Sequence, residues 1–144
     1  MDDWQIFRDP EFALRFKYPT RSTDGEPVDR VETQQEGMLR VHILAPKSRE
    51  VYFEVTRYDS LPAASEYRLH KEYLANQFQS LAITEVAETV CGSLPAYKYT
   101  FQWDQGERVV ILVERGEATY RLIYNPRFLI NLQILSTVEW LDLP

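Results

Sequence analysis

The chain has 144 residues, enough for one domain with one hydrophobic core, and we expect residues 1–144 to form a single domain. Its 22 acidic and 16 basic side chains give a net charge of −6, which repels phosphate backbones, and no run of Lys or Arg offsets it, so nucleic-acid binding is excluded. No apolar run approaches the ~20 residues of a transmembrane helix.

The N-terminus, MDDWQIFRDP, lacks both the basic and the apolar region of a signal peptide. The single cysteine, Cys91, excludes an internal disulfide and favours a reducing compartment. We therefore expect a cytoplasmic protein. A trimmed exported or lipoprotein-attached domain stays open as an alternative.

The first third of the chain predicts strands. In FALRFKYP apolar and polar residues alternate, which indicates a half-buried strand that ends at Pro19. Residues 20–30 form a long polar loop with the turn formers Asp24, Gly25 and Pro27. Further strands are expected at about 31–35, 38–45 and 50–58.

A helix is predicted to begin at Pro62, with Ser60 or Asp59 as its cap. One apolar stripe runs along it, as in an amphipathic helix with one buried face. The residues of this stripe are Ala63, Tyr67, Leu74, Phe78 and Leu81.

Four strands are predicted next, near 83–90 and over 96–103, 108–114 and 118–124, with Gly116-Glu117 as a two-residue turn. Residues 109–113 are apolar without alternation, so both faces of the sheet must be covered there.

The last predicted helix spans 126–141, with Asn125 as its cap and Pro126 in its first position. With the earlier helix it gives a candidate cover for each face of the sheet. The expected fold is therefore α+β: a three-layer α/β/α sandwich, with a central twisted antiparallel sheet and helices on both faces.

No motif in the sequence indicates a reaction. His42 and His70 are interpreted as rim and boundary residues, and Cys91 as a buried apolar thiol. Ser93 lacks the surroundings of a hydrolase nucleophile. We therefore expect no catalytic residue, no cofactor and no metal, and hence no enzyme.

Several segments resemble Mog1/PsbP-like domains. FALRFKYP is similar to their first strand, which ends in Tyr-Pro, and GSLPAYKYTF, residues 92–101, to their Gly-x-x-Ala-x-x-Tyr/Phe segment. YRLIYNPRFLINLQILSTVEWL, residues 120–141, is similar to their final strand and helix. The chain departs from them at Thr20-Arg21, where relatives often carry Gly-Trp.

The resemblance implies an uncharacterised bacterial member of that family, with an α/β/α sandwich and no catalytic residues to carry over. Its known relatives are mostly not enzymes. They include a photosystem II extrinsic subunit, a regulator of the Ran GTPase, and bacterial chaperones or lipoprotein-attached domains.

The leading hypothesis is a non-catalytic accessory domain that binds an unidentified protein partner. Its surface would be the part of helix 126–141 that the sheet leaves uncovered, including Leu129, Trp140 and Leu141, and a homodimer through this face is the simplest version. The alternative is a small-molecule or lipid carrier with an apolar cavity between sheet and helix, lined by Tyr97, Tyr99 or Trp103. A helix-grip fold would need a C-terminal helix longer than the ~16 residues available here.

Overall fold

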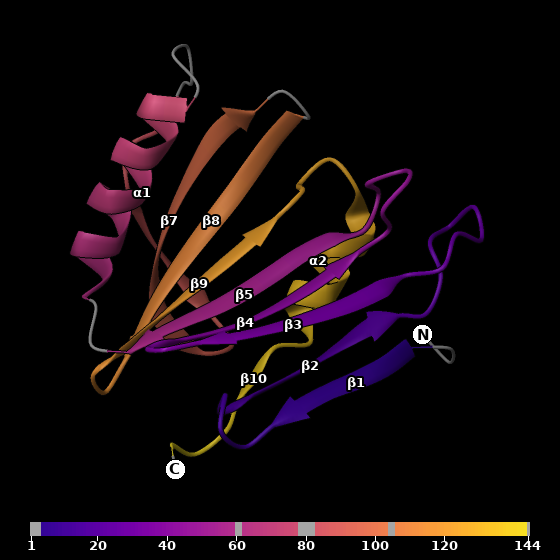
Figure 1. Ribbon diagram of the computed structural model, residues 1–144, viewed down its shortest axis with the longest axis horizontal. Helices are drawn as coiled ribbons and strands as arrows, with labels where there is room; N and C mark the ends of the chain where they lie inside the picture. Colours follow the sequence, from indigo (N-terminus) through magenta and orange to yellow (C-terminus); the bar gives the residue numbers. More distant parts are fainter. Residues whose placement is uncertain (1–3, 60–61, 78–82, 104–105, 144) are drawn as a thin grey trace.

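The computed structural model describes residues 4–59, 62–77, 83–103 and 106–143, with the backbone alone for residues 73–77 and 103 (Figure 1). Its larger sheet is antiparallel, in the order β3-β4-β5-β9-β8-β7-β6. These strands are β3 (Asp29–Gln35), β4 (Met38–Leu44), β5 (Tyr52–Asp59), β6 (Ala87–Cys91), β7 (Leu94–Trp103), β8 (Gly106–Arg115) and β9 (Ala118–Tyr124). A second sheet has the order β1-β2-β10, from β1 (Trp4–Asp9), β2 (Leu14–Pro19) and β10 (Glu139–Trp140).

The strands predicted over 31–58 and 96–124 are confirmed, with boundary shifts of a few residues. The hairpin between β8 and β9 turns through Gly116-Glu117 and pairs Arg115 with Ala118, as predicted. Gly116 has a φ of +61°, a conformation that costs glycine little and suits a two-residue hairpin turn. The strand expected near 83–90 begins later, at Ala87, and Ile83 forms an isolated bridge with Phe101.

Strand β8 separates two apolar clusters, so the prediction that both sheet faces are covered here is confirmed. Val109, Ile111 and Val113 pack into one cluster. Val110 and Leu112 point the other way, into a cluster with Tyr99. These five residues of β8 are all buried.

The predicted three-layer α/β/α sandwich with helices on both faces is wrong. Helix α1 (Ala63–Gln77) lies against one face of the larger sheet, whereas the opposite face is covered mainly by the second sheet (Figure 1). Helix α2 (Leu129–Ser136) has only 8 residues and packs against β2 and β5, on the same face of the larger sheet as the second sheet. The molecule is thus mostly sheet, and its second covering layer is made of strands.

The predicted helix over 126–141 is too long at both ends. Asn125 does not cap it: its Oδ1 accepts a hydrogen bond from the N–H of Arg127 in a turn before the helix begins. At the other end Thr137 donates its hydroxyl hydrogen to the carbonyl of Ile134, 2.7 Å away, and closes the last turn. The chain then extends, and Glu139 pairs with Arg15 of β2.

Helix α1 begins close to its predicted start. Ala63 is buried, and its N–H donates to the carboxylate of Glu114 on β8, 2.9 Å away. Asp59 ends β5, and the other predicted cap, Ser60, lies outside the described residues, as do Phe78 and Leu81 and the side chain of Leu74. Among the described residues no helix has both the length and the apolar content to span a membrane.

Candidate functional site

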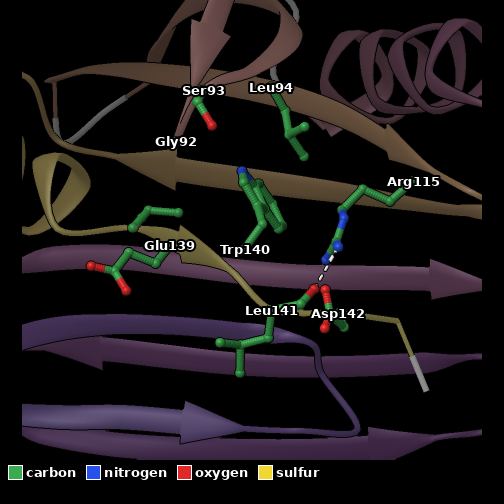
Figure 2. Close-up of a pocket in the computed structure, with 9 residues that line it drawn as sticks. Gly92, Ser93, Leu94, Arg115, Glu139, Trp140, Leu141 and Asp142 are labelled. Carbon is green, nitrogen blue, oxygen red and sulfur yellow. Dashed lines mark hydrogen bonds between the residues drawn. The ribbon is translucent and has the colours of Figure 1, made fainter.

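A hollow of about 580 Å³ lies between the β6–β7 hairpin and the last described residues of the chain (Figure 2). It brings together two of the predicted contact residues, Trp140 and Leu141, both half-buried. The third, Leu129, lies apart from them on the first turn of α2 and is 67% exposed. The predicted contact surface is therefore divided between α2 and the segment that contains β10.

Trp140 connects the two sheets. Its indole N–H donates to the carbonyl of Cys91 on β6, 2.8 Å away, and its ring meets the ring of Tyr120 edge to face, with 4.9 Å between the centroids. A Cβ at Gly92 would lie 2.9 Å from the indole nitrogen, and Gly92 has a φ of +52°. Only glycine fits there without strain or displacement of the tryptophan.

Arg115, on the wall of the same hollow, holds the end of the chain in place. Its guanidinium donates to the carbonyls of Ala13 and Leu141, and the second of these bonds is drawn in Figure 2. The same group lies 5.2 Å from the centre of the Trp140 ring. Because both terminal nitrogens of the guanidinium already donate to backbone carbonyls, the cation contributes to the packing of the two sheets.

A second hollow, of about 310 Å³, lies between α1 and the larger sheet. We call it the α1 groove; it is lined by Ala63, Ala64, Tyr67, Val86, Tyr97, Leu112 and Glu114. Of the three residues predicted for a groove, Tyr97 lines it and is 43% exposed. Tyr99 is buried beneath α1, and the side chain of Trp103 lies outside the described residues.

Buried charges lie on the same face of the sheet, where sequence reasoning did not place any. The guanidinium of Arg121 on β9 bridges two carboxylates, Glu66 of α1 at 3.0 Å and Glu54 of β5 at 3.4 Å. Arg40 of β4 also contacts Glu54, at 3.3 Å. Burial raises the pKa of Glu66, and Arg121 opposes that rise. Structural ion pairs shift pKa values as catalytic ones do, and this network ties α1 to the sheet.

The signal for this network was present in the sequence. Glu54 and Thr56 occupy alternate positions beside the apolar and aromatic residues at the start of β5. In β9, the next strand of the sheet, Arg121 also lies between apolar and aromatic residues. A polar residue on a covered face needs a partner. Which partner it has depends on the pairing of β5 with β9, which brings Thr56 opposite Arg121.

His70 lies in this layer and is neutral in the fold. It is 8% exposed, and its Nδ1 shares a hydrogen bond with the hydroxyl of Tyr99. Burial, with a smaller effect of Arg121, lowers the pKa of His70 to about 3. The sequence predicts His70 at the boundary of the helix stripe, but the structure buries it.

We expect acid to destabilise the protein through His70. Because its pKa is lower in the fold than the ordinary 6.5, the unfolded chain binds the proton first as the pH falls. The contribution of neutral His70 to the free energy of unfolding is present above about pH 6.5 and is lost as the pH falls towards 3. Between pH 7 and pH 5 this loss is about 2 kcal/mol. Urea unfolding at both pH values tests this against His70→Gln, whose amide can still bond Tyr99. An equal pH dependence in the two proteins would contradict it.

The other candidate residues have contacts of a structural kind. Cys91 is buried, as predicted, and burial raises the pKa of its thiol to about 11. His42 meets the ring of Tyr52 edge to face, and burial lowers its pKa. Ser93 occupies the tight β6–β7 turn with a φ of +70°. Within the described parts of the chain, no group of three or more His, Cys, Asp or Glu side chains could hold a metal ion.

Neither a protein-family model nor a curated protein matches this sequence. Among solved structures, the chain is similar to cyanobacterial PsbP (CyanoP) from Synechocystis sp. PCC 6803, with a TM-score of 0.65 and 11% identity over 97% of this chain and 94% of that one. A second similar structure, from Bacteroides thetaiotaomicron, has a TM-score of 0.54 and 12% identity over 97% of this chain. This chain spans about half of that protein, 49% of its length.

These similarities confirm the resemblance at the level of the fold: the chain has a PsbP-like fold. At such low identity the similarity concerns the arrangement of strands and helices, and a fold by itself does not define an activity.

Proposed function

We propose that this chain is a non-catalytic accessory domain that acts by binding a protein partner. The observation that carries the proposal is an apolar ridge on the outer side of α2, formed by Leu129, 67% exposed, and Leu132, 39% exposed. The two residues are three positions apart, so they lie side by side on the helix surface. Asn131 and Ile134 are buried on the inner side.

The outer side of α1 differs from this α2 ridge. Arg68, Lys71 and Glu72 are exposed there, around Leu69. Exposed apolar side chains on a short helix do not stabilise it in water. Clustered apolar surface is typical of a contact site. The apolar residues of α2 therefore fall into two sets: one is buried against β2 and β5, and the other forms the α2 ridge.

Trp140 and Leu141 stay predictions as contact residues. Trp140 lies in β10 and Leu141 directly follows it with its N–H bonded to the carbonyl of Ala13, so substitutions there would change the fold together with any association. Leu129 is therefore the residue that separates the two effects.

If the partner is a second copy of this chain, which is the simplest version, Leu129→Glu should convert a dimer into a monomer, because a charge would be buried in an apolar contact. The free energy of unfolding should change by less than about 0.5 kcal/mol, since the side chain is exposed. Native mass spectrometry and urea unfolding measure the two quantities. Leu69→Glu on α1, a leucine that is 45% exposed, is the matched control and should leave the dimer intact.

A carrier of small molecules is the second candidate, and the α1 groove favours it. Its volume of about 310 Å³ is at the lower end of the ~300–1,000 Å³ of ligand sites, and Val86, Tyr97 and Leu112 give it an apolar lining. Native mass spectrometry distinguishes the two proposals. A monomer with additional bound mass that is lost in Ala64→Phe, which fills the groove, would support the carrier and contradict the homodimer.

The proposal also takes residues 1–144 as one domain in a cytoplasmic setting, without a nucleic-acid partner. The net charge of −6 and the inert Cys91 thiol support this part.

A further inference from the structure

Strand β6 is an edge of the larger sheet, and no described strand pairs with its outer side. The other edge, β3, also exposes an apolar residue, Val31 at 50%, but Asp29, Arg30 and Glu32 lie around it and protect that edge from pairing with other chains. On β6, Val90 is 66% exposed and Glu88 is the one charged residue of the strand. An apolar edge strand offers both backbone hydrogen bonds and apolar contacts to another extended chain.

The outward backbone groups of β6 follow from its pairing with β7. Val90 is opposite Pro95, which has no N–H, so these two residues cannot exchange the pair of bonds of a hydrogen-bonded pair. The N–H and C=O of Val90 therefore point away from β7. Because the pattern alternates along an antiparallel ladder, those of Glu88 also point outward.

The side chains beside this edge continue into the α1 groove. Glu88 pairs with Tyr97 and Val90 with Pro95, so Val90 and Tyr97 share the sheet face on which α1 lies. Val86, 37% exposed, lines the groove together with Tyr97. We call Val86, Val90 and Tyr97 the apolar shelf.

The edge is also held in a fixed position. At the end of β6 the carbonyl of Cys91 accepts the indole N–H of Trp140, and Cys91 itself is buried. A strand fixed in this way loses little conformational freedom when another strand is added, which favours binding.

We propose that β6 and the apolar shelf bind an extended segment of a partner protein, which adds one strand to the larger sheet. Residues of that segment opposite Val86 and Val90 are apolar, and the residue opposite Glu88 is Lys or Arg. The pattern is apolar-x-basic-x-apolar, because alternate residues face the shelf. The exposed carboxylates of Glu85 and Glu88, in a chain of net charge −6, favour the basic residue.

A second copy of this chain fits the edge less well. A symmetric β6–β6 pairing centred on Glu88 sets this carboxylate opposite its own copy, and like charges in opposite positions destabilise a strand pair. A pairing centred on Thr89 sets Glu88 opposite Val90, so the carboxylate meets an apolar side chain and has no basic partner. This site differs from the α2 ridge, so the failure of one proposal leaves the other standing.

The probe is a fluorescein-labelled synthetic peptide, Thr-Val-Thr-Lys-Thr-Val-Thr, and its binding is measured by fluorescence anisotropy. We expect Val90→Pro to weaken binding at least about tenfold, because proline removes the outward N–H while the ladder bonds to β7 remain. Glu88→Lys should weaken binding of this peptide and strengthen binding of the peptide with Glu in place of Lys. That exchange of preference cannot come from unfolding.

Two controls complete the experiment. Leu129→Glu should leave peptide binding unchanged, which separates this site from the α2 ridge. Amide NMR shifts of the wild-type protein should concentrate on residues 86–90 when the peptide is added. Equal binding of a scrambled peptide, unchanged binding by Val90→Pro, or a dimer that only Val90→Pro dissociates would overturn the proposal.

Discussion

Asn131→Leu should lower the free energy of unfolding by at least about 3 kcal/mol, because three backbone groups, two of them in buried bonds and one in a partly buried bond, lose their partner at about 1–3 kcal/mol each. Asn131 is fully buried on α2. Its Oδ1 accepts the N–H of Tyr52 at 2.9 Å, and its Nδ2 donates to the carbonyls of Glu50 and Asn125, at 2.9 and 3.0 Å. One side chain thus fixes α2, the start of β5 and the turn after β9.

Urea unfolding at pH 7 measures this effect. Gln133→Leu is the matched control, since Gln133 is exposed two residues further along the same helix, and its substitution should cost less than about 0.5 kcal/mol. Equal stability of the two variants would show that Asn131 does not hold α2 in place.

The second large effect is expected from Arg121→Met. The variant leaves the carboxylates of Glu54 and Glu66 buried without their shared cation, a loss that typically costs about 3–5 kcal/mol. The cost should shrink as the pH falls. Without Arg121 the pKa of Glu66, already raised by burial, rises further, and a raised carboxyl pKa gives stability at low pH that is lost as the pH rises through it.

Urea unfolding at pH 7 and at pH 5 tests both parts. Arg15→Met, which breaks the exposed pair of Arg15 with Glu139, is the control and should cost no more than about 1 kcal/mol. The triple variant Arg121→Met with Glu54→Gln and Glu66→Gln should recover part of the loss, because the buried charges are gone. A cost of Arg121→Met no larger than that of Arg15→Met would contradict the assigned role.

Local patterns were sufficient for the centre of the larger sheet. The unbroken apolar run at 109–113 predicted that both faces of the larger sheet are covered, and Gly116-Glu117 predicted the position of the hairpin. Both signals concern neighbours in the sequence, where backbone preference and burial act over a few residues.

In the second sheet only β2, the predicted strand that ends at Pro19, followed from such a pattern, and β1 and β10 could not be predicted in this way. In β1 two apolar residues are adjacent, Ile6 exposed and Phe7 buried, so apolar and polar residues do not alternate along the segment. The segment after Ser136 carries apolar residues at spacings that suit a helix, yet Val138 is buried and Trp140 pairs with Leu14 of β2. Long-range pairing overrides local preference there, and a periodic pattern contains no information about a partner so distant.

The candidate sites were predicted in part. Leu129 lies on a part of its helix that the sheet leaves uncovered, as predicted, and its contact role stays a prediction. Tyr97 lines the α1 groove. The network around Arg121 and the anchor Asn131 were missed, because a polar residue in an apolar segment signals only that a partner exists. The fold decides which one.

The position of β10 also determines when the molecule can be completed. Its residue Glu139 contacts Arg15, 124 positions earlier in the chain. A ribosome releases the N-terminal hairpin first, so Leu14 and Phe16, both fully buried in the finished protein, emerge long before their last neighbours are made. Such non-local pairings are slow to form, and the nascent chain carries its apolar N-terminal hairpin incompletely covered until β10 has emerged.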